Sequence, residues 1–194
     1  RGYVGDGRSH IMHLRVNDAE MGVDGSELAL DTPGKVTVTA KVAARLNEQP
    51  DAALRNRPYE QKPFWHIERA RIGESRNVKL ELVVNGHAVA SQSFNADGEL
   101  RDVTFNDVQI DRSSWVAMRI LPSSHTNPVW VIVDGQPVHP SKRSAQWCLK
   151  SVDQLWSQKQ RFIDADEMQD AIEAYDAARA TYRRIIAQAF DDTK

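Results

Sequence analysis

Alternation of apolar and polar residues along the first 140 positions indicates a chain built mainly from β-strands. The pattern is clearest over 35–46, where every even-numbered residue from Val36 to Ala44 is valine or alanine. Lysine or threonine stands at the odd positions from Lys35 to Lys41, as in an antiparallel strand with one buried face. Similar runs recur and predict about nine short strands, at the spacing typical of β-sandwiches. They cover 10–16, 26–30, 64–72, 78–84, 88–94, 100–110, 114–121, 129–133 and 136–139.

Turn residues separate these runs. Asn85-Gly86 lies between two of them and is the strongest short signal for a β-hairpin. Asp97-Gly98 and Asp134-Gly135 mark further turns, and Asn106-Asp107 interrupts its run in the manner of a β-bulge. No helical pattern lies between the strands, which argues against parallel βαβ units. We therefore expect residues 1–140 to form an antiparallel, immunoglobulin-like β-sandwich.

The hydrophobic period changes from two to that of a helix after Pro140. One apolar stripe runs through Trp147 and Trp156, and a second follows a capping-box pattern formed by Asp164 and Glu167. Residues 141–194 are thus expected to form an antiparallel pair of α-helices. This pair would pack on itself or on the sandwich.

Composition narrows the classes of partner. The 194 residues carry a formal net charge of −2, which argues against a nucleic-acid module. No apolar run is long enough to cross a membrane, and Cys148 is the single cysteine, so a disulfide or a multi-thiolate metal site within the chain is excluded. The sequence begins at Arg1 in loop-like residues without a signal peptide, which suggests the middle of a longer protein. Localisation and homo-oligomerisation stay open.

The common catalytic and metal-binding motifs are absent from the sequence, including G-x-S-x-G, HExxH and CxxC. His10 and His13 would lie on opposite faces of a regular strand and could not share a metal ion. We therefore expect no catalytic residue, metal ligand or cofactor in this chain. The residues expected at an interface or pocket rim are Arg8, His10, Trp65, His66, Arg69, His125, Thr126 and Asn127.

Two segments supply most of these candidates. Phe64–Arg69 mixes aromatic and charged residues, which suits either a ligand pocket or a strand with one packed face. Leu121–Pro128 is a polar loop between two apolar runs. Its serine, histidine and asparagine side chains would hydrogen-bond the local backbone. The alternative is a catalytic serine–histidine pair, which would also need an orienting group and an oxyanion hole. Trp65 is the one tryptophan expected to be free for ligand stacking. The others fall within apolar strand or helix patterns.

Several segments also carry a family resemblance. They are Arg1–His10, Val16-Asn17-Asp18, Val83–Val89, Ser113–Arg119, His125–Val131, Val133–Val138 and Ser144–Cys148. Together they resemble the C-terminal region of CehA/McbA-type metallohydrolases, and Arg1–His10 resembles the join that follows the catalytic PHP domain of that family. The resemblance covers nearly the whole chain, but none of these motifs is catalytic.

The resemblance implies a role for the parent protein more than for this chain. PHP domains are distorted barrels whose histidine and aspartate residues bind divalent metals and activate water. No position here matches those ligands, so the metals would belong to an upstream catalytic domain and this chain would be its non-catalytic companion. Carbamate and phosphate esters are both open as substrates of such a parent. The alternatives are a ligand- or carbohydrate-binding module, and a free-standing enzyme that uses His66 or His125.

Overall fold

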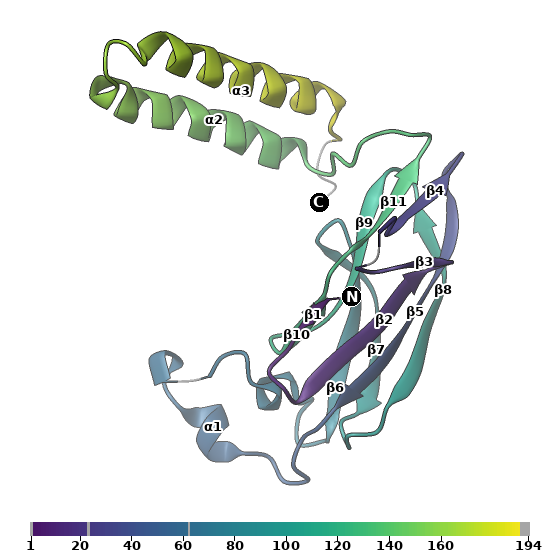
Figure 1. Ribbon diagram of the computed structural model, residues 1–194. Coiled ribbons are helices and arrows are strands. Elements are labelled where there is room, and N and C mark those ends of the chain that lie inside the picture. Colours follow the sequence, from purple (N-terminus) through teal and green to yellow (C-terminus); the bar gives the residue numbers. More distant parts are fainter. Residues whose placement is uncertain (1, 23, 62, 191–194) are drawn as a thin grey trace. The chain divides into compact units, whose positions relative to one another are not determined.

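The computed structural model describes residues 2–22, 24–61 and 63–190, which divide into two compact units, Arg1–Val138 and His139–Lys194. The first unit is mainly β and contains two sheets, curled in the manner of a half-barrel (Figure 1). The second unit is helical. None of the helices in the described ranges is both long and apolar enough to span a membrane.

The larger sheet has seven strands. Its main path runs through β1 (Tyr3–Val4), β10 (Ser124–Thr126), β9 (Ser114–Ile120), β11 (Val129–Val133) and β4 (Glu27–Leu30). On the other edge of β9, β6 (Asn77–Val84) pairs with β9 and then with β7 (His87–Asn95). The smaller sheet consists of β3 (Ala19–Glu20), β2 (Ser9–Val16), β5 (Gly34–Ala44) and β8 (Arg101–Ile110), in that order.

Both sheets contribute inward-facing side chains to one hydrophobic cluster. The larger sheet supplies Val78, Leu80, Leu82, Val116, Met118, Ile120, Val129 and Val131. The smaller sheet supplies Ile11, Leu14, Val16, Val36, Val38, Val42, Val103, Phe105 and Ile110. Because successive strand residues point to opposite faces, this set also fixes which side chains remain on the outer faces.

Several expectations from the sequence are confirmed. Val36, Val38, Ala40, Val42 and Ala44 of β5 are all buried. Asn85 and Gly86 connect β6 to β7 with φ values of 51° and 92°, the backbone that a type I′ hairpin turn requires. The bulge expected near Asn106-Asp107 is present, because Asp107 has φ 55° and the β5–β8 register shifts beside it.

The prediction of purely antiparallel pairing was wrong for one edge of the larger sheet. Strand β4 runs parallel to β11, with Glu27 opposite Trp130 and Leu30 opposite Val133. The two strands are far apart in the sequence, so a hairpin does not dictate their direction. The structure describes eleven strands, and the added ones include the two-residue strands β1 and β3.

Strand β2 contains an irregularity that the sequence did not reveal. His13 has φ 53°, and the β2–β5 register shifts between Met12 and Arg15. The shift places Ile11 and Leu14 in the core, whereas strict alternation would have separated them. The expectation that His10 and His13 lie on opposite faces therefore fails, since His13 lies within this bulge and neither residue is buried.

Residues 64–72 do not form the expected strand. The segment between β5 and β6 contains α1 (Ala52–Asn56) and two 3₁₀ helices, η1 (Tyr59–Gln61) and η2 (Ile67–Ala70). The expected strand at 136–139 is also absent, whereas strand β10 lies inside the expected loop at 121–128. Short aromatic and charged stretches therefore followed tertiary contacts and not local β-propensity.

The helical unit is an antiparallel hairpin. It consists of α2 (Lys142–Lys159), the 3₁₀ turn η3 (Gln160–Phe162) and α3 (Met168–Gln188) (Figure 1). The Lys142 N–H donates to the Phe190 carbonyl at 3.0 Å, which ties the beginning of α2 to the end of α3. The rings of Trp156 and Tyr175 meet between the helices, with centroids 4.9 Å apart.

Two details of the helical prediction were wrong. No Asp164–Glu167 capping box is formed, because Glu167 itself occupies the N-cap of α3 and its side chain makes no capping bond. Trp147 was expected in a buried stripe but is 69% exposed. The cap of α2 is regular, since the Ser141 hydroxyl accepts from the Ser144 N–H at 3.0 Å.

Candidate functional site

Asp6 connects the N-terminal segment to the rest of the β unit. Its Oδ1 accepts from the Arg8 N–H at 2.9 Å and from the Ser9 hydroxyl at 3.3 Å, and its Oδ2 accepts from the Ile67 N–H at 2.8 Å. The Ser9 hydroxyl also bonds that of Ser123. Burial raises the pKa of Asp6, but these hydrogen bonds outweigh it and leave the pKa below its ordinary value of 3.8. Asp6 thus joins three segments in which the sequence had indicated candidate residues.

His66 and Arg69 have structural partners close to them. The Nδ1 atom of His66 accepts from the Glu68 N–H at 3.0 Å and caps η2. Arg69 donates from Nη1 to the Phe64 carbonyl at 3.1 Å. Trp65 is 51% exposed and meets the ring of Phe64 edge to face, with centroids 5.0 Å apart. Phe64 is 49% exposed, and Arg69 is also exposed, so the segment presents both aromatic and charged surface.

A buried ion pair holds this aromatic segment in place. The Glu68 carboxylate accepts from Nε of Arg71 at 2.6 Å and from Nη2 at 2.9 Å, and both side chains are almost fully buried. Arg71 also donates to the carbonyls of Ser75 and Asn47 at 3.0 and 2.8 Å. The two ends of the β5–β6 connection are therefore tied to one guanidinium group.

Of the 125–127 candidates, Thr126 is buried, whereas His125 and Asn127 are exposed. The Thr126 hydroxyl is buried and accepts from the Met118 N–H at 3.1 Å. The Asn127 N–H donates to the Gly2 carbonyl at 2.8 Å and extends the pairing of β10 with β1. His125 is exposed and lies opposite Arg119 of β9.

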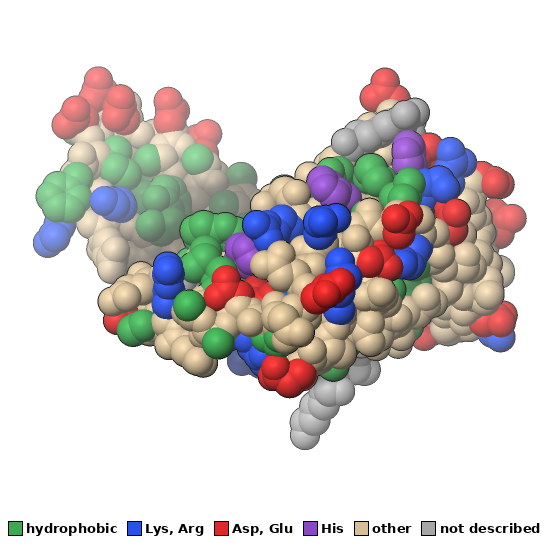
Figure 2. Space-filling view, turned by 90° about the horizontal axis from the view of Figure 1, so that it is seen from below, with side chains coloured by type: hydrophobic (Ala, Val, Ile, Leu, Met, Phe, Trp, Pro, Cys, Tyr) green, Lys and Arg blue, Asp and Glu red, His purple; other side chains and the backbone are tan. Residues whose placement is uncertain are grey.

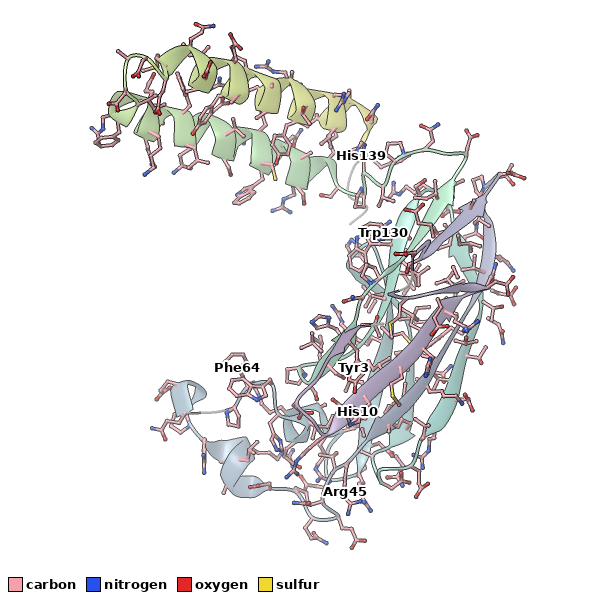
Figure 3. The ribbon with its side chains drawn as sticks, viewed as in Figure 1. Tyr3, His10, Arg45, Phe64, Trp130 and His139 are labelled. Atoms are coloured by element: carbon pink, nitrogen blue, oxygen red, sulfur yellow. The ribbon has the colours of Figure 1, made fainter. Side chains whose placement is uncertain are left out.

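The outer side of the larger sheet presents apolar side chains. Because Val116 and Met118 of β9 point into the core, Trp115 and Ala117 point to the opposite side. Trp115 lies opposite Trp130 in the β9–β11 register, and Ala117 is paired in the same way with Val83 of β6. Figure 3 labels Trp130. We call the following residues the outer apolar face: Val4, Val83, Trp115, Ala117, Leu121 and Trp130.

A pocket of about 290 Å³ opens on the outer apolar face. Val83, Trp115, Ala117 and Leu121 line its apolar side, and Arg119 and His125 are among its polar lining residues. Arg119 is already engaged, since its Nε donates to Glu81 at 2.8 Å. Leu121 of the pocket wall and Val4, which lies outside the pocket, are 56% and 59% exposed. Trp130 is 39% exposed, so Trp65 is not the one exposed tryptophan.

Arg8 and His10 line a different hollow, of about 240 Å³, together with Arg45 and Gly98. The Arg45 N–H donates to the Arg8 carbonyl at 2.8 Å, which sets the two residues side by side on neighbouring strand ends. The Tyr3 hydroxyl bonds Nδ1 of His10 at 2.5 Å. Figure 3 labels Tyr3, His10 and Arg45 in this part of the sheets.

The eight candidates from the sequence are therefore not gathered at one point. Within the described ranges, no three histidine, cysteine, aspartate or glutamate side chains are placed to hold a metal ion. Sequence reasoning missed Arg45 and Trp130. The period-two pattern of 129–133 held a signal for Trp130, because its buried neighbours Val129 and Val131 turn it outward. No local signal marks Arg45.

Comparisons with known proteins returned no relative: no family model matches the chain, and no curated protein and no solved structure is significantly similar to it.

Proposed function

We propose that this chain is a non-catalytic interaction domain that packs against the catalytic domain of a metal-dependent hydrolase of the PHP superfamily. The observation that carries the proposal is the outer apolar face, on which Val4, Leu121 and Trp130 are exposed while Val83 and Ala117 are buried. Folded monomers rarely leave large contiguous apolar surface uncovered, and such patches commonly mark binding sites for other proteins. Aromatic residues such as Trp115 and Trp130 are also the ones that contribute most to interface energies.

The choice of partner rests on the resemblance of Arg1–His10 to the join that follows a PHP domain. Strand β1 lies in this segment and pairs with β10, and Val4 of β1 belongs to the outer apolar face. A domain joined before Arg1 would therefore begin close to this face, which would favour intramolecular docking through a high effective concentration.

We further infer that the β unit is a sandwich of the immunoglobulin-like kind. The support is the single hydrophobic cluster to which both sheets contribute. In such a sandwich the loops and outer faces are free for recognition while the core is occupied by packing. Function would then be located on surfaces, as the outer apolar face is.

The test pairs two leucines of similar exposure. Leu121 belongs to the outer apolar face, whereas Leu100 precedes β8 and is 53% exposed. The gene upstream of the Arg1 codon is read, and the domain it encodes is mixed with this chain in a calorimetric titration. We expect Leu121→Ser and Trp130→Ser to weaken binding by about tenfold or more, because truncated interface anchors cost at least about 1.4 kcal/mol. Leu100→Ser should bind as the wild type does.

Two outcomes would contradict the proposal. One is an upstream sequence that encodes no barrel with histidine and aspartate metal ligands. The other is binding that Leu121→Ser, Trp130→Ser and Leu100→Ser change equally, since the outer apolar face would then have no special part in it.

A carbohydrate-binding module is the second candidate function. The observation in its favour is the exposed pair Phe64 and Trp65, because aromatic rings are common platforms for apolar ligand surfaces. The two rings are inclined by 79°, so a single sugar can stack on one of them at a time. Glycan-array signals that disappear in Trp65→Ala would support this function, and an array without signals would count against it.

A further inference from the structure

A basic hollow lies at the end of the smaller sheet, away from the outer apolar face. Strand pairing sets Ser9 opposite Ala44 and His10 opposite Ala43, and the Arg45 N–H bonds the Arg8 carbonyl just beyond. Arg8, His10, Ala43 and Arg45 thus share the side of the sheet opposite the core. Together with Gly7, Ala44 and Gly98, these four residues line the hollow of about 240 Å³.

The two guanidinium groups lack carboxylate partners within the described part of the chain, because the nearby acids are occupied elsewhere. Arg45 is bridged along the backbone to Asp97, but Arg101 takes both oxygens of that carboxylate, at 2.7 and 2.5 Å. The carboxylate oxygens of Asp6 accept hydrogen bonds from the Arg8 and Ile67 backbone amides and from serine hydroxyls. Positive charge in the hollow is therefore not cancelled by a direct ion pair.

Gly98 lets Arg45 extend over the hollow. A Cβ atom at position 98 would stand 3.3 Å from Nη1 of Arg45, and the φ of Gly98 is +98°, which L side chains rarely adopt. The Gly98 N–H donates to the Ala44 carbonyl at 2.8 Å, so the turn is fixed to the strand end beneath Arg45. Glycine at this position thus combines a tight turn with room for the guanidinium group.

His10 adds a third polar group whose orientation is fixed. The Tyr3 hydroxyl bonds Nδ1, and the two rings meet edge to face with centroids 5.6 Å apart. When the hydroxyl donates, the neutral imidazole carries its proton on Nε2, on the far side of the ring. The Nε2–H is then left free to donate to a ligand in the hollow that His10 lines.

We propose that Arg8, His10 and Arg45 form a binding site for a phosphate group, either free phosphate or a small phosphomonoester. Two arginines offer several N–H donors in the planar arrangement that suits phosphate oxygens, and charge-assisted hydrogen bonds of this kind are among the strongest. Figure 2 looks onto the molecule from this end and shows Lys and Arg side chains interspersed with Asp and Glu side chains on this face. The net charge of −2 and the carboxylates around this group disfavour a long polyanion such as nucleic acid.

The test is a titration of the full chain, labelled with ¹⁵N, with inorganic phosphate at constant ionic strength. We expect saturable shifts of the Gly7, Arg8, Arg45 and Gly98 amide signals, with a dissociation constant in the millimolar range that suits an open site. Arg8→Gln and Arg45→Gln should each weaken binding by about tenfold or more, because each removes a charged hydrogen-bond donor. A parallel titration with methyl phosphate separates the two ligands: binding of both assigns the site to phosphomonoesters, and binding of inorganic phosphate alone assigns it to the free anion.

The matched control is Arg57→Gln. Arg57 is exposed at the end of α1 in the same unit, and its side chain makes no hydrogen bond or ion pair with the described residues. It removes the same charge without touching the hollow, and dispersed amide spectra confirm that all variants are folded. The proposal is overturned if shifts do not saturate below about 50 mM phosphate, since the dissociation constant would then lie above the expected millimolar range. It is overturned equally if acetate binds as tightly, or if Arg57→Gln weakens binding as much as Arg45→Gln.

Discussion

Replacing Arg71 by methionine should destabilise the β unit strongly. The guanidinium group of Arg71 donates twice to Glu68, at 2.6 and 2.9 Å, and also to the carbonyls of Ser75, Asn47 and Gln49. The side chains of Arg71 and Glu68 are 0% and 3% exposed, so water cannot replace these bonds without opening the structure. The variant leaves a buried carboxylate without its cation and three carbonyls without their donor.

The expected loss is about 3–5 kcal/mol, the usual cost of removing one partner from a buried ion pair. A single domain is stable by only about 5–15 kcal/mol, so a loss of this size is a large fraction of the total. The pair itself adds much less than this, because its formation also requires the desolvation of both charges. Glu68→Met/Arg71→Met should therefore recover part of the stability that Arg71→Met loses, because it removes the bare carboxylate but leaves the three carbonyls without their donor.

The measurement is equilibrium unfolding in urea, followed by tryptophan fluorescence and far-UV circular dichroism, for the wild type, both single variants and the double variant. Amide hydrogen exchange at Asp51 adds a local probe, because its N–H donates to Oε1 of Glu68 at 3.2 Å. A loss below about 1 kcal/mol in Arg71→Met, with unchanged exchange at Asp51, would refute the reasoning, since the site would then tolerate a bare carboxylate. A double variant no more stable than Arg71→Met would refute the argument about desolvation.

Two further predictions concern the turn at Asn85-Gly86 and the N-terminal segment. Gly86→Ala should cost about 1–2 kcal/mol in urea unfolding, because alanine is strained at the φ of 92°. Gly34→Ala is the control, since its Cβ would meet no atom closer than 3.8 Å and its φ is not in the left-handed region. Equal losses of unfolding free energy in Gly86→Ala and Gly34→Ala would contradict the prediction. The lowered pKa of Asp6 means that the folded protein binds this proton less readily than the unfolded chain does, so the resulting stability is present above pH 3.8 and disappears as the pH falls through the folded pKa. Asp6→Asn should lack that contribution, so its urea midpoint should be lower than that of the wild type at neutral pH and approach it in acid. A difference in midpoint that stays constant with pH would show that Asp6 acts through something other than its charge.

Local patterns determined the parts of the fold in which one physical cause dominates. The alternation in β5 predicted its buried face because one side of a strand in a two-layer structure must avoid water. Asn85-Gly86 and the bulge at Asp107 were predictable because both depend on the few residues that accept positive φ. The two helices followed from their period, while the beginning of α3 did not, because Glu167 takes the cap position without forming a box.

Tertiary contacts decided what those patterns could not. The residues at 64–72 have the composition of a strand, yet the Glu68–Arg71 pair and the bond from Ile67 to Asp6 hold them in a 3₁₀ turn. The parallel direction of β4 depends on a neighbour about a hundred positions away, for which no local signal exists.

The candidate sites show the same division. Arg8 and His10 could be identified from the sequence as polar residues beside a strand, and so could His125. Arg45 could not, because only the register of β2 against β5 sets it beside Arg8, and only Arg101 keeps Asp97 from neutralising it. The sequence by itself determined which side chains can bear charge, face outward or bend the chain. The tertiary structure alone decided which of them meet, because strand register and buried hydrogen bonds join residues that are distant along the chain.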